Sequence, residues 1–225
     1  MGKEYRQDID IKSSILDFER ILLFDSFEEA TVWLASGTAT LPAFTKVNTE
    51  YAAHGIFVGK LFCTDVGGAE AGDTVLASRY FPYFGQKKII ASQFVSFSNA
   101  SDVSFISLKL DILDGSINHQ FGVGFNTSTS KIQYLNPLGA WANASNTTIP
   151  ISPAGLTYFK VMVNLVTLKY ISLQVGTLII PFTASSYFGA FSANPIESHV
   201  TLQITSAGSG TNPITYFDAL LIQAD

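Results

Sequence analysis

Cysteine is almost absent from this chain, which has one thiol, Cys63, in 225 residues. A single cysteine excludes an intramolecular disulfide and a zinc site built on several thiolates. The apolar neighbours Leu61 and Phe62 predict that Cys63 is a buried structural residue.

Charge is also scarce, since Lys, Arg, Asp and Glu together make up 14% of the chain, against about 25% in a typical soluble domain. The net charge is −5, and Lys87 and Lys88 form the largest basic cluster. Proteins that bind nucleic acid normally present a basic stripe to the phosphates. The composition therefore argues against a nucleic-acid partner, and the 47% hydrophobic content argues against a disordered chain.

Long apolar runs are missing as well. No stretch approaches the roughly 18 uncharged apolar residues that span a bilayer, so we expect no membrane insertion. The first ten residues contain neither an apolar segment nor the small-residue cleavage site of a secretory signal. From this we expect a protein that is made in the cytoplasm and is not exported by the Sec pathway.

Catalytic motifs are absent too. The chain contains no Gly-x-Ser-x-Gly nucleophile elbow, no His-x-x-x-His pair and no Glu-x-Asp-x-Glu strand of the kind used by sandwich glucanases. Asp111 and Asp114 are the nearest pair of strand carboxylates, but their spacing of three places them on opposite faces of a strand. We therefore expect a protein that is not an enzyme and has no catalytic residues.

The body of the chain has the pattern of antiparallel strands. Apolar and polar residues alternate over 106–112, 121–125, 159–165, 171–175 and 200–204, and the segment 216–222 is apolar on nearly both faces. Asp114-Gly115 and Gly176-Thr177 are hairpin signals between such segments. The chain is long enough for one large domain, and we predict an all-β, antiparallel jelly-roll β-sandwich with a short N-terminal arm or helix.

The N-terminal 30 residues hold 12 of the charged residues, which marks a boundary in composition. We therefore divide the chain into an arm, residues 1–20, and the sandwich, residues 21–225. Ile11, Ile15 and Phe18 fall at helical spacing, and with Tyr5 they are the apolar and aromatic residues of this arm. Two interpretations stay open: a short helix that caps the sandwich, or an arm that docks on a neighbouring subunit.

Both ends and one central hairpin resemble known sandwich domains. Residues 24–29, followed by Trp33, resemble the opening strand of jelly-roll carbohydrate-binding modules, and residues 216–220 resemble their closing strand. Residues 170–176 are similar to a strand of laminin-G and concanavalin-like domains, although the usual Asp before Gly176 is missing. The resemblance implies the sandwich fold and a glycan as partner, but fold alone does not fix activity.

The same resemblance implies a structural calcium ion where the first and last strands meet. The carboxylates at the matching positions are Asp25, Glu28 and Asp218. Calcium takes six to eight oxygen ligands, which three carboxylates and backbone carbonyls could supply. The alternative is that these carboxylates bind to the backbone or to solvent.

Several aromatic residues stand in loop-like contexts outside the strand patterns. We expect some of them to pack in the core, and others to contact a neighbouring subunit or to stack on a sugar ring. Trp141 is expected in a loop, and the segment around Pro82 is not expected to be a central strand. The candidate ligand or interface aromatics are Tyr80, Phe81, Tyr83, Phe84, Trp141 and Tyr187.

The missing motifs, the low charge and the aromatic content predict a non-enzymatic structural protein of a homo-oligomeric assembly. The expected place is a virion or another assembled particle, as a capsid, decoration or appendage component that contacts other structural subunits. The alternative is a carbohydrate-binding module with a structural calcium ion and a glycan partner.

Overall fold

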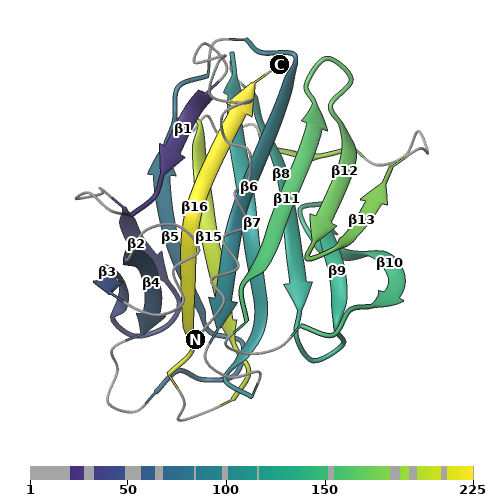
Figure 1. The fold of residues 1–225 in the computed structure, drawn as a ribbon. Helices are drawn as coiled ribbons and strands as arrows, with labels where there is room; N and C mark the ends of the chain where they lie inside the picture. Colours follow the sequence, from purple (N-terminus) through teal and green to yellow (C-terminus); the bar gives the residue numbers. More distant parts are fainter. Residues whose placement is uncertain are drawn as a thin grey trace, which may run out of the picture.

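Most described residues of the computed structural model lie in β-strands (Figure 1). The model describes residues 21–27, 33–48, 57–63, 68–83, 85–97, 101–115, 117–151, 155–182, 188–192, 197–208 and 212–224. These ranges contain no helix long and apolar enough to cross a membrane.

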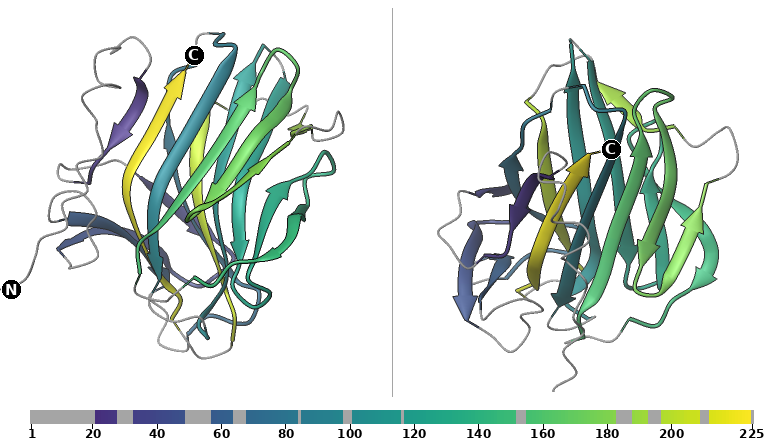
Figure 2. Two further views of the ribbon diagram at one scale, coloured as in Figure 1. Left: turned by 45° about the vertical axis from the view of Figure 1, so that its right-hand side comes forward. Right: turned by 45° about the horizontal axis from the view of Figure 1, so that its top comes forward.

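Two antiparallel sheets pack face to face (Figure 2). Sheet A has the order β13 (Leu178–Pro181), β12 (Lys169–Val175), β11 (Thr157–Asn164), β6 (Lys88–Phe97), β16 (Ile214–Ala224), β4 (Phe57–Cys63) and β3 (Pro42–Asn48), with β1 (Ile21–Asp25) paired to β16. Sheet B has the order β10 (Trp141–Thr148), β9 (Lys131–Leu135), β8 (Ile117–Asn126), β7 (Val103–Asp114), β15 (His199–Ser206), β5 (Thr74–Tyr80) and β2 (Leu34–Gly37), with β14 (Ala190–Ser192) paired to β8.

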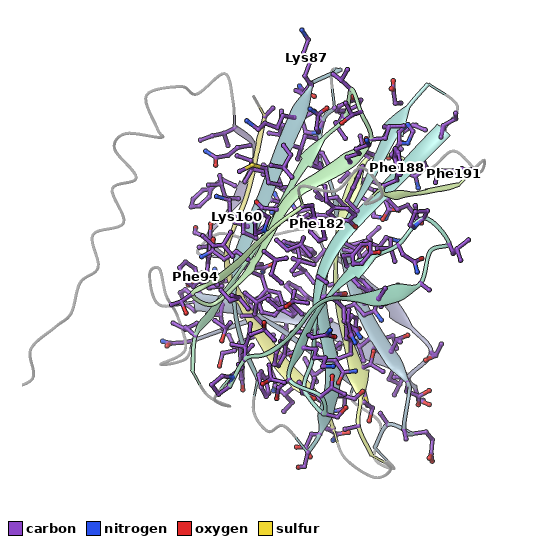
Figure 3. The ribbon with its side chains drawn as sticks, turned by 90° about the vertical axis from the view of Figure 1, so that its right-hand side faces the viewer. Lys87, Phe94, Lys160, Phe182, Phe188 and Phe191 are labelled. Atoms are coloured by element: carbon purple, nitrogen blue, oxygen red, sulfur yellow. The ribbon has the colours of Figure 1, made fainter. Side chains whose placement is uncertain are left out.

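The core lies between the sheets because alternate residues of each strand point inward. On β7 the inward residues Ile106, Leu108, Leu110 and Ile112 are buried. Phe159 of β11 and Phe217 of β16 meet them from sheet A, and side chains fill the space between the sheets (Figure 3). Cys63 is buried and free, as the sequence predicts.

The predicted sandwich is confirmed, and so are its main hairpins. β7 and β8 join through Asp114 and Gly115, where Gly115 has a positive φ of 64°. β12 and β13 join through Gly176, whose φ of 59° also favours glycine. β16 lies inside sheet A between β6 and β4, as its two apolar faces predict.

The first and last described strands of the chain are neighbours, as the family resemblance implies, since β1 pairs antiparallel with β16. Arg79 of β5 forms an ion pair with Asp25 of β1 and thereby links the two sheets. The predicted arm of residues 1–20, with Tyr5, Ile11, Ile15 and Phe18, lies outside the described residues and stays a prediction.

Candidate functional site

The outer face of sheet B, turned away from sheet A, carries a continuous set of polar and aromatic side chains. The strand register arranges them in rows across the sheet. One row runs through Tyr80, His199, Asp111 and Gln120, and a second through Leu34, Ser78, Thr201, Lys109 and Gly122. A third row runs through Ser36, Leu76, Gln203, Ser107, Gly124, Gln133 and Asn143.

Two glycines form a floor on this face, and two aromatic rings lie over it. A Cβ on Gly122 would come within 2.6 Å of Cη2 of Trp141, and a Cβ on Gly124 would come within 2.4 Å of Cζ of Phe105. The rings of Phe105 and Trp141 pack together with centroids 4.9 Å apart. Glycine is therefore required at both positions, because any side chain would displace a ring.

Trp141 begins β10 and does not lie in a loop as we expected; its half-buried ring rests on the strand next to its own hairpin. Phe105 is 8% exposed, so Trp141 is the aromatic side chain of this pair that a ligand can reach. Beside it, the amide Nε2 of Gln133 donates to Oδ1 of Asn143 at 3.0 Å. An indole ring flanked by amides is a suitable platform for a sugar ring, which offers an apolar face and a rim of hydroxyls.

A buried carboxylate organises the neighbouring rows. Asp111 has a side chain that is 0% exposed, and its Oδ1 accepts hydrogen bonds from Nδ2 of Asn118 at 3.1 Å and from Nε2 of Gln120 at 2.6 Å. Its Oδ2 lies 3.2 Å from Nζ of Lys109 and 3.2 Å from Nε2 of His199. Burial of a carboxylate requires such partners, since an unpaired buried charge is strongly destabilising.

His199 has an oxygen acceptor at each ring nitrogen. Nδ1 lies 2.8 Å from the carbonyl oxygen of Glu197, and Nε2 faces Asp111. The ring of Tyr80 packs edge-on against this imidazole, with the ring centroids 6.2 Å apart, and Tyr80 is 55% exposed.

The other candidate aromatics divide between surface and core. Phe81 is 5% exposed and belongs to the core, so its ring does not present a ligand or interface surface. Tyr83 is half-buried, its hydroxyl donates to the carbonyl of Gln86 at 3.3 Å, and burial raises the pKa of that hydroxyl, assisted by the charge of Asp114. Phe84 and Tyr187 lie outside the described residues.

The carboxylates expected to bind calcium have hydrogen-bond partners within the protein. Oδ1 of Asp25 accepts from the backbone nitrogen of Phe27 at 2.8 Å, and Oδ2 accepts from Nε1 of Trp33 at 2.9 Å and from Arg79. The carboxylate of Asp218 accepts from the backbone nitrogen of Ala219 at 2.7 Å. Glu28 lies outside the described residues, so the calcium site stays a prediction.

No group of three or more His, Cys, Asp and Glu side chains within the described ranges is arranged to hold a metal ion. This finding covers Asp25 and Asp218 but not Glu28.

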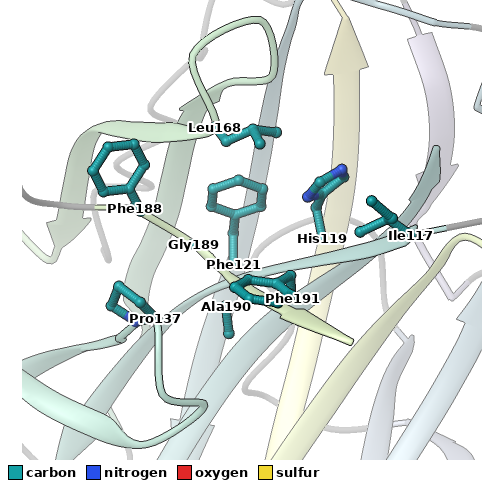
Figure 4. Close-up of a pocket in the computed structure, with 9 residues that line it drawn as sticks. All are labelled: Ile117, His119, Phe121, Pro137, Leu168, Phe188, Gly189, Ala190 and Phe191. Atoms are coloured by element: carbon teal, nitrogen blue, oxygen red, sulfur yellow. The ribbon is translucent and has the colours of Figure 1, made fainter. Parts of the chain in front are cut away.

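A hollow of about 450 Å³ lies beside β14 and the N-terminal half of β8 (Figure 4). Its lining is apolar apart from one imidazole and comprises Ile117, His119, Phe121, Pro137, Leu168, Phe188, Gly189, Ala190 and Phe191. It offers few polar groups to orient a hydrophilic ligand. The outer face of sheet B is therefore the better candidate for a functional site.

Sequence reasoning missed the residues around Asp111. Lys109, Asp111 and Gln120 occupy the polar positions of two alternating strands, which look like ordinary solvent-facing positions. The sequence signal that could have identified them was the presence of two charged residues, Lys109 and Asp111, in a charge-poor body. The contact of Asp111 with His199, however, depends on the pairing of β15 with β7.

No protein-family model and no curated protein matches the sequence. Solved structures do share the fold. An endo-β-1,4-glucuronan lyase from Trichoderma reesei aligns with a TM-score of 0.59 and 7% identity, over 91% of this chain and 96% of that one. The cellulose-induced protein Cip1 aligns with a TM-score of 0.56 and 12% identity, over 89% and 96%.

Arcelin-5, a lectin-like defence protein from Phaseolus vulgaris, aligns with a TM-score of 0.52 and 11% identity, over 90% of this chain and 98% of that one. At these identities the comparisons concern the fold. The chain therefore has the jelly-roll β-sandwich fold that lectin-like and glycan-acting proteins share, as the sequence resemblance implied.

Proposed function

We propose that the chain binds carbohydrate on the outer face of sheet B. The observation that carries the proposal is the Trp141 ring, held over the glycine floor and bordered by Gln133, Asn143 and Lys109. The floor leaves room for the indole, which packs against Phe105 with the two ring planes tilted by 59°. A sugar stacked on its accessible part would then exchange hydrogen bonds with the neighbouring amides and the ammonium group.

The structural comparisons support this proposal more than a structural role in a virion. A glucuronan lyase and a lectin-like protein share the fold. Because fold alone does not determine function, the argument rests mainly on the side chains of the outer face.

The proposal is binding without cleavage. A glycosidase uses two carboxyl groups across the scissile bond, whereas Asp111 is the one carboxylate that the described strands of sheet B place on this face. Its Oδ1 accepts hydrogen bonds from Asn118 and Gln120, and its Oδ2 lies 3.2 Å from both Lys109 and His199. A carboxylate held in this way is poorly placed to act on a substrate.

The test is a glycan array followed by calorimetry on the best ligand. We expect the wild type to bind and Trp141→Ala to lose at least about tenfold in affinity, because one stacked aromatic ring contributes about 1–3 kcal/mol. Phe191→Ala is the matched control, since this aromatic residue is 71% exposed but lies at the hollow beside β14. Equal losses for both variants, or no binding by the wild type, would contradict the proposal.

The homo-oligomeric assembly stays a separate proposal. Light scattering of the full chain, and of a chain without residues 1–20, measures the native mass of each. A large species that depends on these residues would support the docking arm, and a monomer of the full chain would contradict it.

A further inference from the structure

We infer that the preferred glycan is anionic and that Lys109 selects its carboxylate or sulfate group. This inference rests on the proposed binding site and names its ligand class.

The first argument is the distribution of charge. The whole chain carries a net charge of −5. Yet the charged residues that the described strands of sheet B turn outward are Lys109, Lys131 and Asp111. Asp111 is 0% exposed, whereas the side chain of Lys109 is 26% exposed. The charge that these strands present to a ligand is therefore positive.

The second argument is the arrangement of groups around Asp111. Its Oδ1 accepts hydrogen bonds from Asn118 and Gln120, and Nζ of Lys109 lies 3.2 Å from its Oδ2. An ammonium group has three donors, and only one of those on Lys109 is directed at Asp111. The remaining donors are available to an acceptor on the ligand.

The third argument is distance. Lys109 pairs with Gly122, and Gly122 lies beneath the Trp141 ring. Adjacent strands are about 4.8 Å apart, which is close to the width of a pyranose ring. A sugar stacked on Trp141 therefore extends an acidic substituent toward Lys109. Charge-assisted hydrogen bonds are roughly twice as strong as neutral ones, so this contact would dominate selectivity.

The experiment uses the full chain on an array that holds each neutral oligosaccharide beside its uronate and sulfated counterparts, for example cellotetraose beside β-1,4-linked tetraglucuronate. At low salt we expect the anionic member of a pair to bind about tenfold more tightly. The preference should shrink in 0.5 M NaCl because the attraction is screened. A preference for uronate or for sulfate identifies the acidic group that the site recognises.

Two variants keep the test independent of folding. Lys109→Arg retains the charge and should retain the preference. The double variant Lys109→Met with Asp111→Asn removes the cation without leaving a buried carboxylate short of a partner. It should bind both members of a pair equally. Lys160→Met is the control, because Lys160 lies on β11 of sheet A (Figure 3) and should leave the preference unchanged.

The two proposals fail differently. Equal binding of neutral and anionic glycans, or an unchanged preference in the double variant, overturns the anionic selectivity. If Trp141→Ala still abolishes binding in that case, the carbohydrate site itself stands. If the wild type binds no glycan on the array, both proposals are overturned.

Discussion

The hydroxyl of Tyr170 accepts a hydrogen bond from the backbone nitrogen of Gly122 at 2.8 Å, across the core from sheet A to sheet B. The same hydroxyl donates to the carbonyl oxygen of Leu135 at 2.9 Å. Gly122 and Leu135 lie where the pairing of β8 with β9 ends, after Val123 and Tyr134. The hydroxyl of Tyr170 thus binds the backbone nitrogen of Gly122 and the carbonyl of Leu135 at the point where β8 and β9 separate. This contact lies directly beneath the glycine floor.

Tyr170→Phe should lower the free energy of unfolding by about 1–3 kcal/mol, because it leaves two buried backbone groups without a partner. Guanidinium denaturation measures the change. The control is Tyr80→Phe, which removes a hydroxyl from an exposed side chain and should change stability by less than about 0.5 kcal/mol. Similar losses in both variants would contradict the role of the Tyr170 hydroxyl.

Tyr170 should also make stability depend on alkaline pH. Burial raises the pKa of its hydroxyl far above the ordinary value, although the hydrogen bond that it accepts from Gly122 partly opposes this. Above about pH 10 the unfolded chain loses this proton while the folded chain keeps it, so the folded state binds more protons and stability falls as pH rises. The expected slope is about −1.4 kcal/mol per pH unit, and the Tyr170→Phe variant should have a correspondingly flatter profile.

Gly122→Ala should impair glycan binding more than it impairs folding. The new Cβ would lie 2.6 Å from the Trp141 ring, so the ring must move away from its floor. We expect a loss of affinity of about tenfold or more, measured by calorimetry. Gly208→Ala is the matched control, because a Cβ there meets no atom within 4 Å. Unchanged binding by Gly122→Ala would show that the ring position does not matter.

Gln93→Met should stabilise the protein. Gln93 is 0% exposed, and neither amide atom has a hydrogen-bond partner within the described part of the chain. It lies opposite an irregularity in β16, where the register shifts between Asp218 and Leu221. Removal of an unsatisfied buried amide should raise stability by about 1–3 kcal/mol, seen as a higher melting temperature.

The same exchange at Gln174 is the control for Gln93. The amide of Gln174 donates to the carbonyl of Gly176 at 2.9 Å, so Gln174→Met should stabilise the protein less or not at all. A melting temperature that falls in Gln93→Met would indicate that this amide has a partner after all.

Asp25→Asn should lower the free energy of unfolding by about 2–3 kcal/mol, because Arg79 and Trp33 lose a charged acceptor between the sheets. Thermal unfolding with calcium and with a chelator separates the two roles of Asp25. A loss that is equal in both conditions identifies the ion pair as the stabilising contact. A wild type that melts earlier in the chelator would instead support the predicted calcium site.

The sequence predicted the sandwich because alternation and turn chemistry are local signals, as in residues 106–112 and at Asp114-Gly115. It also identified Trp141 as a candidate ligand residue, although not its place in a strand. The contacts of Asp111 could not be predicted from the sequence, because His199 is 88 residues away and the contact exists only once β15 pairs with β7. Phe81 was predicted as a candidate surface aromatic but lies in the core, because one ring of a Pro-interrupted aromatic segment can still point inward.

The glycine floor has a consequence for the thermodynamics of recognition. Trp141 rests on backbone and on Phe105, so its rotamer is already fixed before a ligand arrives. Binding then costs little side-chain entropy at the ring. Differences in affinity among glycans should consequently report the substituents of the sugar rather than rearrangement of the protein, and the free and bound backbones should superpose closely.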